Sequence, residues 1–298
     1  MNNVGKVRLL LLIFLIGTIT GCRPQVNDPD NGTPGTFYIE NKGSDTLVNL
    51  ALAWAERYQQ VRPEVRLAVS GGGSGTGIAA ILNGTVDIAN ASRRITQEEL
   101  TAAESLGINP VEFVISQDAI AVVVHPQNPI DQLTIQQISD IYSGVINNWS
   151  ELGGEDRPIV RLSRETNSGT HVYFLEEVLR EGDPDDQTLF SPDTLLLPSS
   201  EGITHEVSDN PNAIGYEGLG YITPGMKVLA VARSSGEPYV LPTIETVNDD
   251  TYPIARDLYM YTLGEPTEVV ADYMSWIFSE EAQQIVAELG FVPVDAPD

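Results

Sequence analysis

The chain has 298 residues, with 42 acidic and 16 basic side chains and a formal net charge of −26 at pH 7. This acidic balance argues against nucleic acid as a partner, because the phosphate backbone attracts basic surfaces. Cys22 is the only cysteine, so a disulfide within the chain is excluded.

The first residues have the pattern of a secretory signal. Lys6 and Arg8 precede an unbroken apolar run at 9–16, and small and polar residues lead to Cys22. This pattern predicts a signal peptide over 1–21, because its apolar part is too short to span a bilayer. The residues before Cys22 resemble the lipobox of bacterial lipoproteins, which implies cleavage before Cys22 and acylation of its thiol. The alternative is an uncleaved anchor in which Cys22 is incidental.

The chain then passes through a segment rich in Pro, Gly, Asn and Asp, which predicts a flexible tether over 22–36. Helical and strand-like patterns alternate after it. The patterns predict helices at 47–58, 78–82, 135–141, 171–179, 269–278 and 280–289, and strands at 65–69, 86–89, 119–126, 159–162, 213–216 and 258–262. This order, without an internal repeat, predicts an α/β protein of two lobes that share a cleft.

The glycine-rich stretch "SGGGSGTGI" at 70–78 joins a predicted strand to a predicted helix. It is not a Walker A loop, because Ile78 stands where that motif needs lysine, nor a nucleophile elbow, because Thr76 replaces the second glycine. A relaxed dinucleotide motif also fails, because the helix is short and no acidic residue closes the following strand. The remaining interpretation is an anion nest of bare amides and hydroxyls at a helix N-terminus.

The same construction recurs in "GSDTL" at 43–47 and in "RETNSGTHVYFL" at 164–175. Each motif alone is explained by helix capping. All three sit at strand-to-helix junctions, where α/β proteins bind ligands, so together they predict convergence on one small anion. Arg164 and Arg93 are predicted to supply guanidinium forks, whereas Arg94 is expected to be solvated.

Several blocks, in order along the chain, carry a resemblance to a known family. They are "GSDTLVNLALAWAERY", "GGGSGTGIAAILNGTVDIANASRRI", "LTIQQISDIYSGVINNWSELGG", "RETNSGTHVYF" and "NAIGYEGLGYI". They resemble the phosphate-binding proteins (PstS type) of ATP-driven phosphate importers. The resemblance implies a type II periplasmic-binding-protein fold, with lobe 1 at 37–120 and 258–298 and lobe 2 at 121–257. Two crossing strands, near 119–124 and 257–262, would join the lobes, which close over inorganic phosphate.

The resemblance also implies the ligand shell and the partners. Matched motif by motif, the phosphate-binding residues would be Ser44, Asp45, Thr46, Ser74, Gly75, Ser92, Arg93, Arg164, Ser168, Gly169 and Thr170. The partners would be ABC permease subunits and, through the lipid on Cys22, the extracytoplasmic face of a membrane. We expect a monomer with no cofactor, no metal and no catalytic residue.

Two departures from the family pattern concern the carboxylate that accepts the phosphate proton. Some members have aspartate where this chain has Arg93, and some have aspartate where it has Thr166. We expect Asp45 to replace that acceptor; the alternative is that Asp45 only caps the helix that begins at Thr46.

Three other functions remain open from the sequence. A relative that binds sulfate, molybdate or tungstate is disfavoured by Asp45 together with the two arginines, because such sites use hydroxyls and amides with few full charges and no carboxylate. A secreted phosphatase or hydrolase is disfavoured because His125, His171 and His205 show neither metal-ligand nor triad spacing. A signalling receptor lobe cannot be separated from a transport component on sequence alone.

Overall fold

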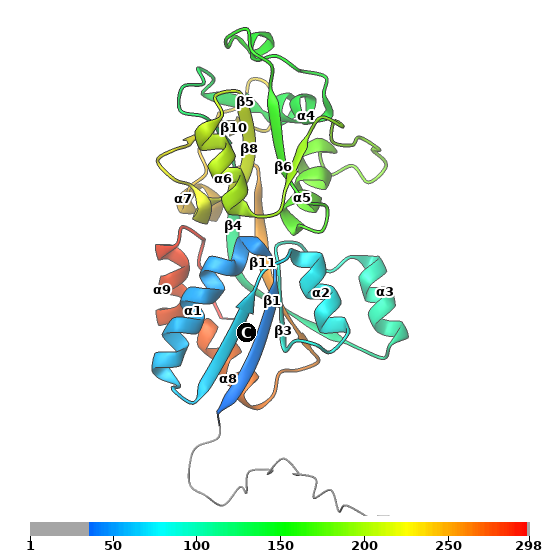
Figure 1. Cartoon of the computed structure of the whole chain (residues 1–298), viewed down its shortest axis with the longest axis vertical. Coiled ribbons are helices and arrows are strands. Elements are labelled where there is room, and N and C mark those ends of the chain that lie inside the picture. Colours follow the sequence, from blue (N-terminus) through cyan, green and yellow to red (C-terminus); the bar gives the residue numbers. More distant parts are fainter. Residues whose placement is uncertain (1–35, 297–298) are drawn as a thin grey trace, which may run out of the picture. The chain divides into compact units, whose positions relative to one another are not determined.

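The computed structural model describes residues 36–296, and its elements form an α/β fold (Figure 1). The strands are β1 (Phe37–Gly43), β2 (Val65–Ser70), β3 (Ile88–Ala91), β4 (Pro110–Val124), β5 (Gln132–Thr134), β6 (Val160–Arg164), β7 (Leu195–Leu197), β8 (Ala213–Gly218), β9 (Lys227–Val228), β10 (Ala230–Ala232) and β11 (Ala255–Leu263). The predicted signal peptide, Cys22 and the tether up to residue 35 lie outside the described residues.

The helices cover both faces of the strands. They are η1 (Asp45–Leu47), α1 (Val48–Val61), α2 (Ser74–Leu82), α3 (Gln97–Ser105), α4 (Ile135–Ser143), η2 (Trp149–Leu152), α5 (Gly169–Phe174), the π-helical η3 (Leu175–Leu179), α6 (Ser200–Asp209), η4 (Leu219–Tyr221), α7 (Ile244–Asn248), α8 (Glu268–Ile277) and α9 (Glu280–Glu288). Among the described residues, no helix is both long enough and apolar enough to cross a bilayer.

Two lobes share one nine-stranded sheet, in the order β2-β1-β3-β11-β4-β8-β6-β7, with β9 paired to β4. In Figure 1 the elements β1–β3, α1–α3, α8 and α9 gather in one lobe and the green and yellow elements in the other. Each lobe has its own large apolar core, around Trp54 and Met260 in the first and around Tyr142 and Phe174 in the second. The predicted two-lobed α/β fold is therefore confirmed.

Strand β4 connects the lobes. It pairs with β11 up to Ala119 and with β8 from Ile120 onward, so its partner changes within one residue step. Residues 119–124 are all fully buried, as expected for a strand covered on both faces. The residue boundaries predicted for the two lobes stay a prediction.

Local patterns located about half of these elements, and three of them differ from their predicted bounds for identifiable reasons. Helix α2 begins at Ser74 rather than at Ile78, so Gly75 and Gly77 lie inside it. Gly77 is required there, because a Cβ would come within 2.6 Å of the Cα of Gly43 and the carbonyl of Lys42. Strand β3 is shifted by two residues from the predicted 86–89, since its pairing with β1 and β11 sets its limits.

The third difference is in the helix predicted at 171–179. It begins earlier, at Gly169, where Ser168 accepts a hydrogen bond from the backbone of Thr170, and it continues beyond Phe174 as the π-helical η3. Other elements were not predicted at all, among them β1, α3 and α6.

Candidate anion-binding site

The predicted anion-binding motifs meet at one edge of the sheet. Strands β1, β2 and β3 are mutually parallel, so their carboxyl ends lie together in the first lobe. The motifs that follow these strands are η1, the N-terminus of α2, and Ser92. The second lobe contributes Arg164, at the carboxyl end of β6, and the N-terminus of α5. The cleft between the lobes thus brings together groups from four junctions.

Two pairs of hydroxyls lie at the centre of this site. The Oγ atoms of Ser74 and Ser92 are 3.2 Å apart, and the backbone N–H of Ser92 donates to Ser74 Oγ at 3.0 Å. Across the cleft, Thr46 Oγ1 and Thr170 Oγ1 are 3.0 Å apart. All four side chains are buried. Gly169 packs directly on the serines, because a Cβ at this position would collide with both Oγ atoms.

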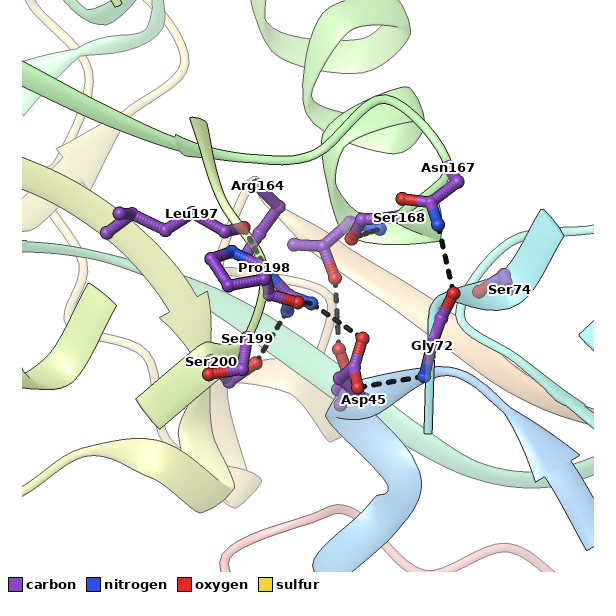
Figure 2. A network of polar contacts seen from close by, with 12 residues as sticks. Asp45, Gly72, Ser74, Arg164, Asn167, Ser168, Leu197, Pro198, Ser199 and Ser200 are labelled. Carbon is purple, nitrogen blue, oxygen red and sulfur yellow. Dashed lines mark hydrogen bonds and ion pairs between the residues drawn. The ribbon is translucent and has the colours of Figure 1, made fainter. Parts of the chain in front are cut away.

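Arg164 is the buried cation of the site, with 1 % of its side chain exposed. Its guanidinium donates to Ser200 Oγ at 2.8 Å and to the carbonyls of Pro198 and Leu197 at 3.0 and 3.3 Å (Figure 2). Its Nη2 also donates to Asp45 Oδ2 of the opposite lobe at 2.8 Å. These contacts fix the orientation of the guanidinium at the cleft.

Asp45 is not a helix cap. Helix η1 begins at Asp45 itself, and neither η1 nor α1 has a side-chain cap bond. Its carboxylate accepts from Arg164 and, at 3.1 Å, from the backbone N–H of Gly72 (Figure 2). The capping role left open by the sequence is therefore wrong, and Asp45 points into the cleft.

Comparison with known proteins places this geometry in a family. The family model described as a PBP superfamily domain matches residues 28–281. The chain is 34% identical to the phosphate-binding protein PstS of Pseudomonas aeruginosa over 275 residues, which cover 87% of this chain and 83% of the relative. It is 30% identical to PstS of Bacillus subtilis, covering 85% and 79% of the two chains. The chain belongs to the PstS-type phosphate-binding proteins. It also resembles a crystal structure with bound phosphate, assigned as a phosphate ABC transporter substrate-binding protein of Clostridium perfringens, with a TM-score of 0.77, 32% identity and coverage of 87% and 100%.

In this PstS-type chain, the guanidinium of Arg93 pairs with a carboxylate of α3. Its two terminal nitrogens bind the two carboxylate oxygens of Glu99, each at 2.8 Å, and Nη1 also donates to the carbonyl of Arg94. Glu99 in turn closes the capping box of α3 with Thr96. The ligand role of Arg93 stays a prediction: its guanidinium pairs with Glu99, and a Cβ at Gly75 would lie 3.8 Å from its Nη2. The side chain of Arg94 is 67% exposed, as expected.

The PstS-type site contains a buried ion pair that the sequence analysis missed, Arg256 with Asp118. The two residues are direct partners in the β11–β4 ladder, and Arg256 Nη2 donates to Asp118 Oδ2 at 3.1 Å. The guanidinium also donates to the carbonyl of Ser92 at 2.9 Å and to Thr170 Oγ1 at 3.0 Å. No pattern within the two strands singles out this pair, because β4 also contains Glu112 and β11 also contains Asp257. The register of the ladder brings Arg256 and Asp118 together, and buried charges require such partners.

Glu217, on β8, is a second missed group of the PstS-type site. Its side chain is fully buried, and neither carboxylate oxygen has a hydrogen-bond partner among residues 36–296. Burial raises the pKa of Glu217 to about 7, although the nearby Arg164 acts in the opposite direction. The Glu217 carboxyl beside Arg164 therefore changes its protonation state near neutral pH.

A cavity of about 680 Å³ opens beside the buried serines of this PstS-type protein. Its lining includes Ser92, Arg93, Arg94, Arg256 and Tyr259. Three guanidinium groups thus lie next to the candidate anion site, on a chain whose overall charge is strongly negative. Within the described residues, no cluster of three His, Cys, Asp or Glu side chains has a metal-binding arrangement.

Proposed function

We propose that this chain captures inorganic phosphate between its lobes, as an extracytoplasmic monomer that catalyses no reaction, and delivers it to an ABC importer. The observation that carries this proposal is the meeting of hydroxyl pairs, helix N-termini and the buried Arg164 in one cleft. Membership of the PstS-type family, including relatives named phosphate-binding proteins, supports the choice of phosphate among small anions.

The proposed chemistry is anion capture by preorganised donors. Backbone amides at helix N-termini and hydroxyls donate to the phosphate oxygens, and the Arg164 guanidinium supplies charge-assisted bonds. Since the protein already holds these donors in place, they need little reorientation when the anion binds. The proposed shell keeps Ser44, Asp45, Thr46, Ser74, Gly75, Ser92, Arg164, Ser168, Gly169 and Thr170, with Arg93 turned toward Glu99 in the present conformation.

Titration calorimetry tests this function on the purified protein. We expect saturable binding of phosphate, no measurable binding of sulfate, and no hydrolysis of p-nitrophenyl phosphate. Tight sulfate or molybdate binding without phosphate binding would identify a receptor for a different oxyanion, and turnover of the ester would identify a phosphatase.

The cleft must open to admit the ligand. Hydrogen bonds of 2.8–3.0 Å join Asp45 to Arg164 and Gly75 to Asn167 across the lobes, so the motifs of the two lobes are in direct contact. We therefore expect an open form without ligand and a closed form with it, related by bending where β4 changes partners. Small-angle scattering should show a smaller radius of gyration when phosphate is added. An identical scattering profile at saturating phosphate would contradict closure.

We further propose that the mature chain begins at Cys22 and is anchored by lipid there. The support is the pattern of the first residues, from Lys6 to Cys22. Two acyl chains are needed for stable membrane residence, so Cys22→Ser should move the protein from the membrane fraction to the soluble fraction. Cleaved Cys22→Ser protein that still sediments with membranes would disprove lipid anchoring at this residue.

A further inference from the structure

An anion site needs groups that donate, whereas a hydroxyl both donates and accepts. A buried hydroxyl that accepts from a protein donor therefore keeps its one proton for another partner. The guanidinium group has donors only, so a hydroxyl bound to arginine must be the acceptor. Thr170 is in this position, because Arg256 Nη2 lies 3.0 Å from its Oγ1.

The proton of Thr170 has one remaining partner. Thr46 Oγ1, at 3.0 Å, is the only other hydrogen-bond partner of Thr170 Oγ1 within residues 36–296. With Thr170 as donor, Thr46 Oγ1 is the acceptor, and its own proton has no protein acceptor in the described part of the chain. Both threonines are at most 1% exposed, so bulk water does not compete for these bonds. The chain of donors runs from Arg256 through Thr170 to Thr46 and ends in the cleft.

The serine pair is a second pair of this kind. The backbone N–H of Ser92 donates to Ser74 Oγ at 3.0 Å, and Ser74 Oγ lies 3.2 Å from Ser92 Oγ. Either hydroxyl can donate to the other, and the one that accepts keeps a proton with no acceptor in the described part of the chain. Arg256 also reaches this pair, because its Nη1 donates to the carbonyl of Ser92 at 2.9 Å.

Arg256 is itself held rigidly. Asp118 Oδ2 accepts from its Nη2, and Asp118 Oδ1 accepts from the backbone N–H of Leu219 at 3.1 Å. The guanidinium carbon lies 5.6 Å from the ring centroid of Tyr173. The side chains of Arg256 and Asp118 are 2% and 0% exposed. This pair lies on the two strands that join the lobes, so Arg256 reaches Ser92 of one lobe and Thr170 of the other.

We propose that Arg256 is a positioning residue of the anion site, which acts through Thr170 to direct the hydroxyl proton of Thr46 toward the ligand without contacting the ligand itself. This inference rests on the proposed phosphate binding. Hydrogen bonds in such a chain polarise one another, so the charge of Arg256 strengthens Thr46 as a donor. Without Arg256, the hydrogen bond between the two threonines could reverse. Thr46 would then donate to Thr170, and the lone pairs of Thr46 Oγ1 would face the anion.

A double-mutant cycle separates this role from a structural one. Removing Arg256 alone would leave Asp118 unpaired, so the variant is the pair Arg256→Gln and Asp118→Asn, in which the two amides can bond to each other. Phosphate affinity is measured by calorimetry with Thr170 present and with Thr170→Val. We expect the paired substitutions Arg256→Gln and Asp118→Asn to weaken phosphate binding about tenfold when Thr170 is present. The same substitutions should have almost no effect in the Thr170→Val background.

The matched control is Arg161→Gln, which alters a buried arginine that binds the carbonyl of Ile146 in the second lobe. It should lower the melting temperature without changing phosphate affinity. An equal loss in both Thr170 backgrounds, or no loss in either, would overturn the role of Arg256. Wild-type protein that binds no phosphate would instead refute the proposed function, and this inference with it.

A second cycle leaves Arg256 intact and applies if the paired variant does not fold. Thr46→Val and Thr170→Val interrupt the same chain at two points. Serial links predict that the double variant binds phosphate about as weakly as the weaker single variant. Losses that multiply would mean two independent donors, and the proposal would be wrong.

Discussion

Arg164→Ala should weaken phosphate binding by about 2–5 kcal/mol, the range found when one partner of a buried charge pair is removed. The guanidinium is almost fully buried and is held by Ser200, Pro198 and Leu197, so it is already oriented for the ligand. The substitution also leaves Asp45 facing the anion without its cation. Calorimetry with phosphate measures the loss directly.

Arg94→Ala is the matched control for this prediction. Its side chain is largely exposed and binds the hydroxyl of Tyr259, outside the hydroxyl pairs. We expect little change in phosphate affinity, because exposed ion pairs contribute little. The reverse order of effects would mean that Arg94 is the cation at the ligand and that Arg164 only supports the fold.

Asp45→Asn should reduce the discrimination between phosphate and sulfate. At neutral pH the phosphate dianion retains a proton and sulfate has none. Each carboxylate oxygen of Asp45 accepts one hydrogen bond from the protein, which leaves lone pairs for a phosphate hydroxyl. A site built around a ligand hydroxyl rejects an analogue lacking it by on the order of 10⁴. We expect weaker phosphate binding and measurable sulfate binding by calorimetry.

The asparagine oxygen can still accept from Gly72 or Arg164, so the melting temperature without ligand should change little. Asp87→Asn is the control, because this exposed carboxylate also accepts from a backbone N–H, that of Glu40, away from the cleft. Unchanged phosphate affinity with sulfate still excluded would place the acceptor elsewhere. Tighter binding of both anions would show that Asp45 competes with the ligand for Arg164.

Local pattern predicted the elements whose apolar residues recur at helical spacing or form a β-branched run. The apolar spacing from Leu47 to Tyr58 predicted α1, and the β-branched run after Ala119 predicted the second half of β4. The start of α2 was missed, because glycines have low helix propensity and here serve the close packing on Gly43. Helix propensity depends on the residue alone, whereas the start of α2 was decided by its packing on Gly43.

The sequence by itself determined the anion-binding character of the chain. Glycines, hydroxyls and Arg164 at strand ends carry that chemistry in their order along the chain, and parallel strands bring such ends together. Which charged groups enter the site was decided by tertiary structure. Arg93 adjoins Ser92 in sequence, yet it pairs with Glu99 of α3, whereas Arg256, far along the chain, reaches Ser92 and Thr170. The physical reason is that a buried charge settles where partners are available, and long-range strand pairing supplied Asp118 to Arg256.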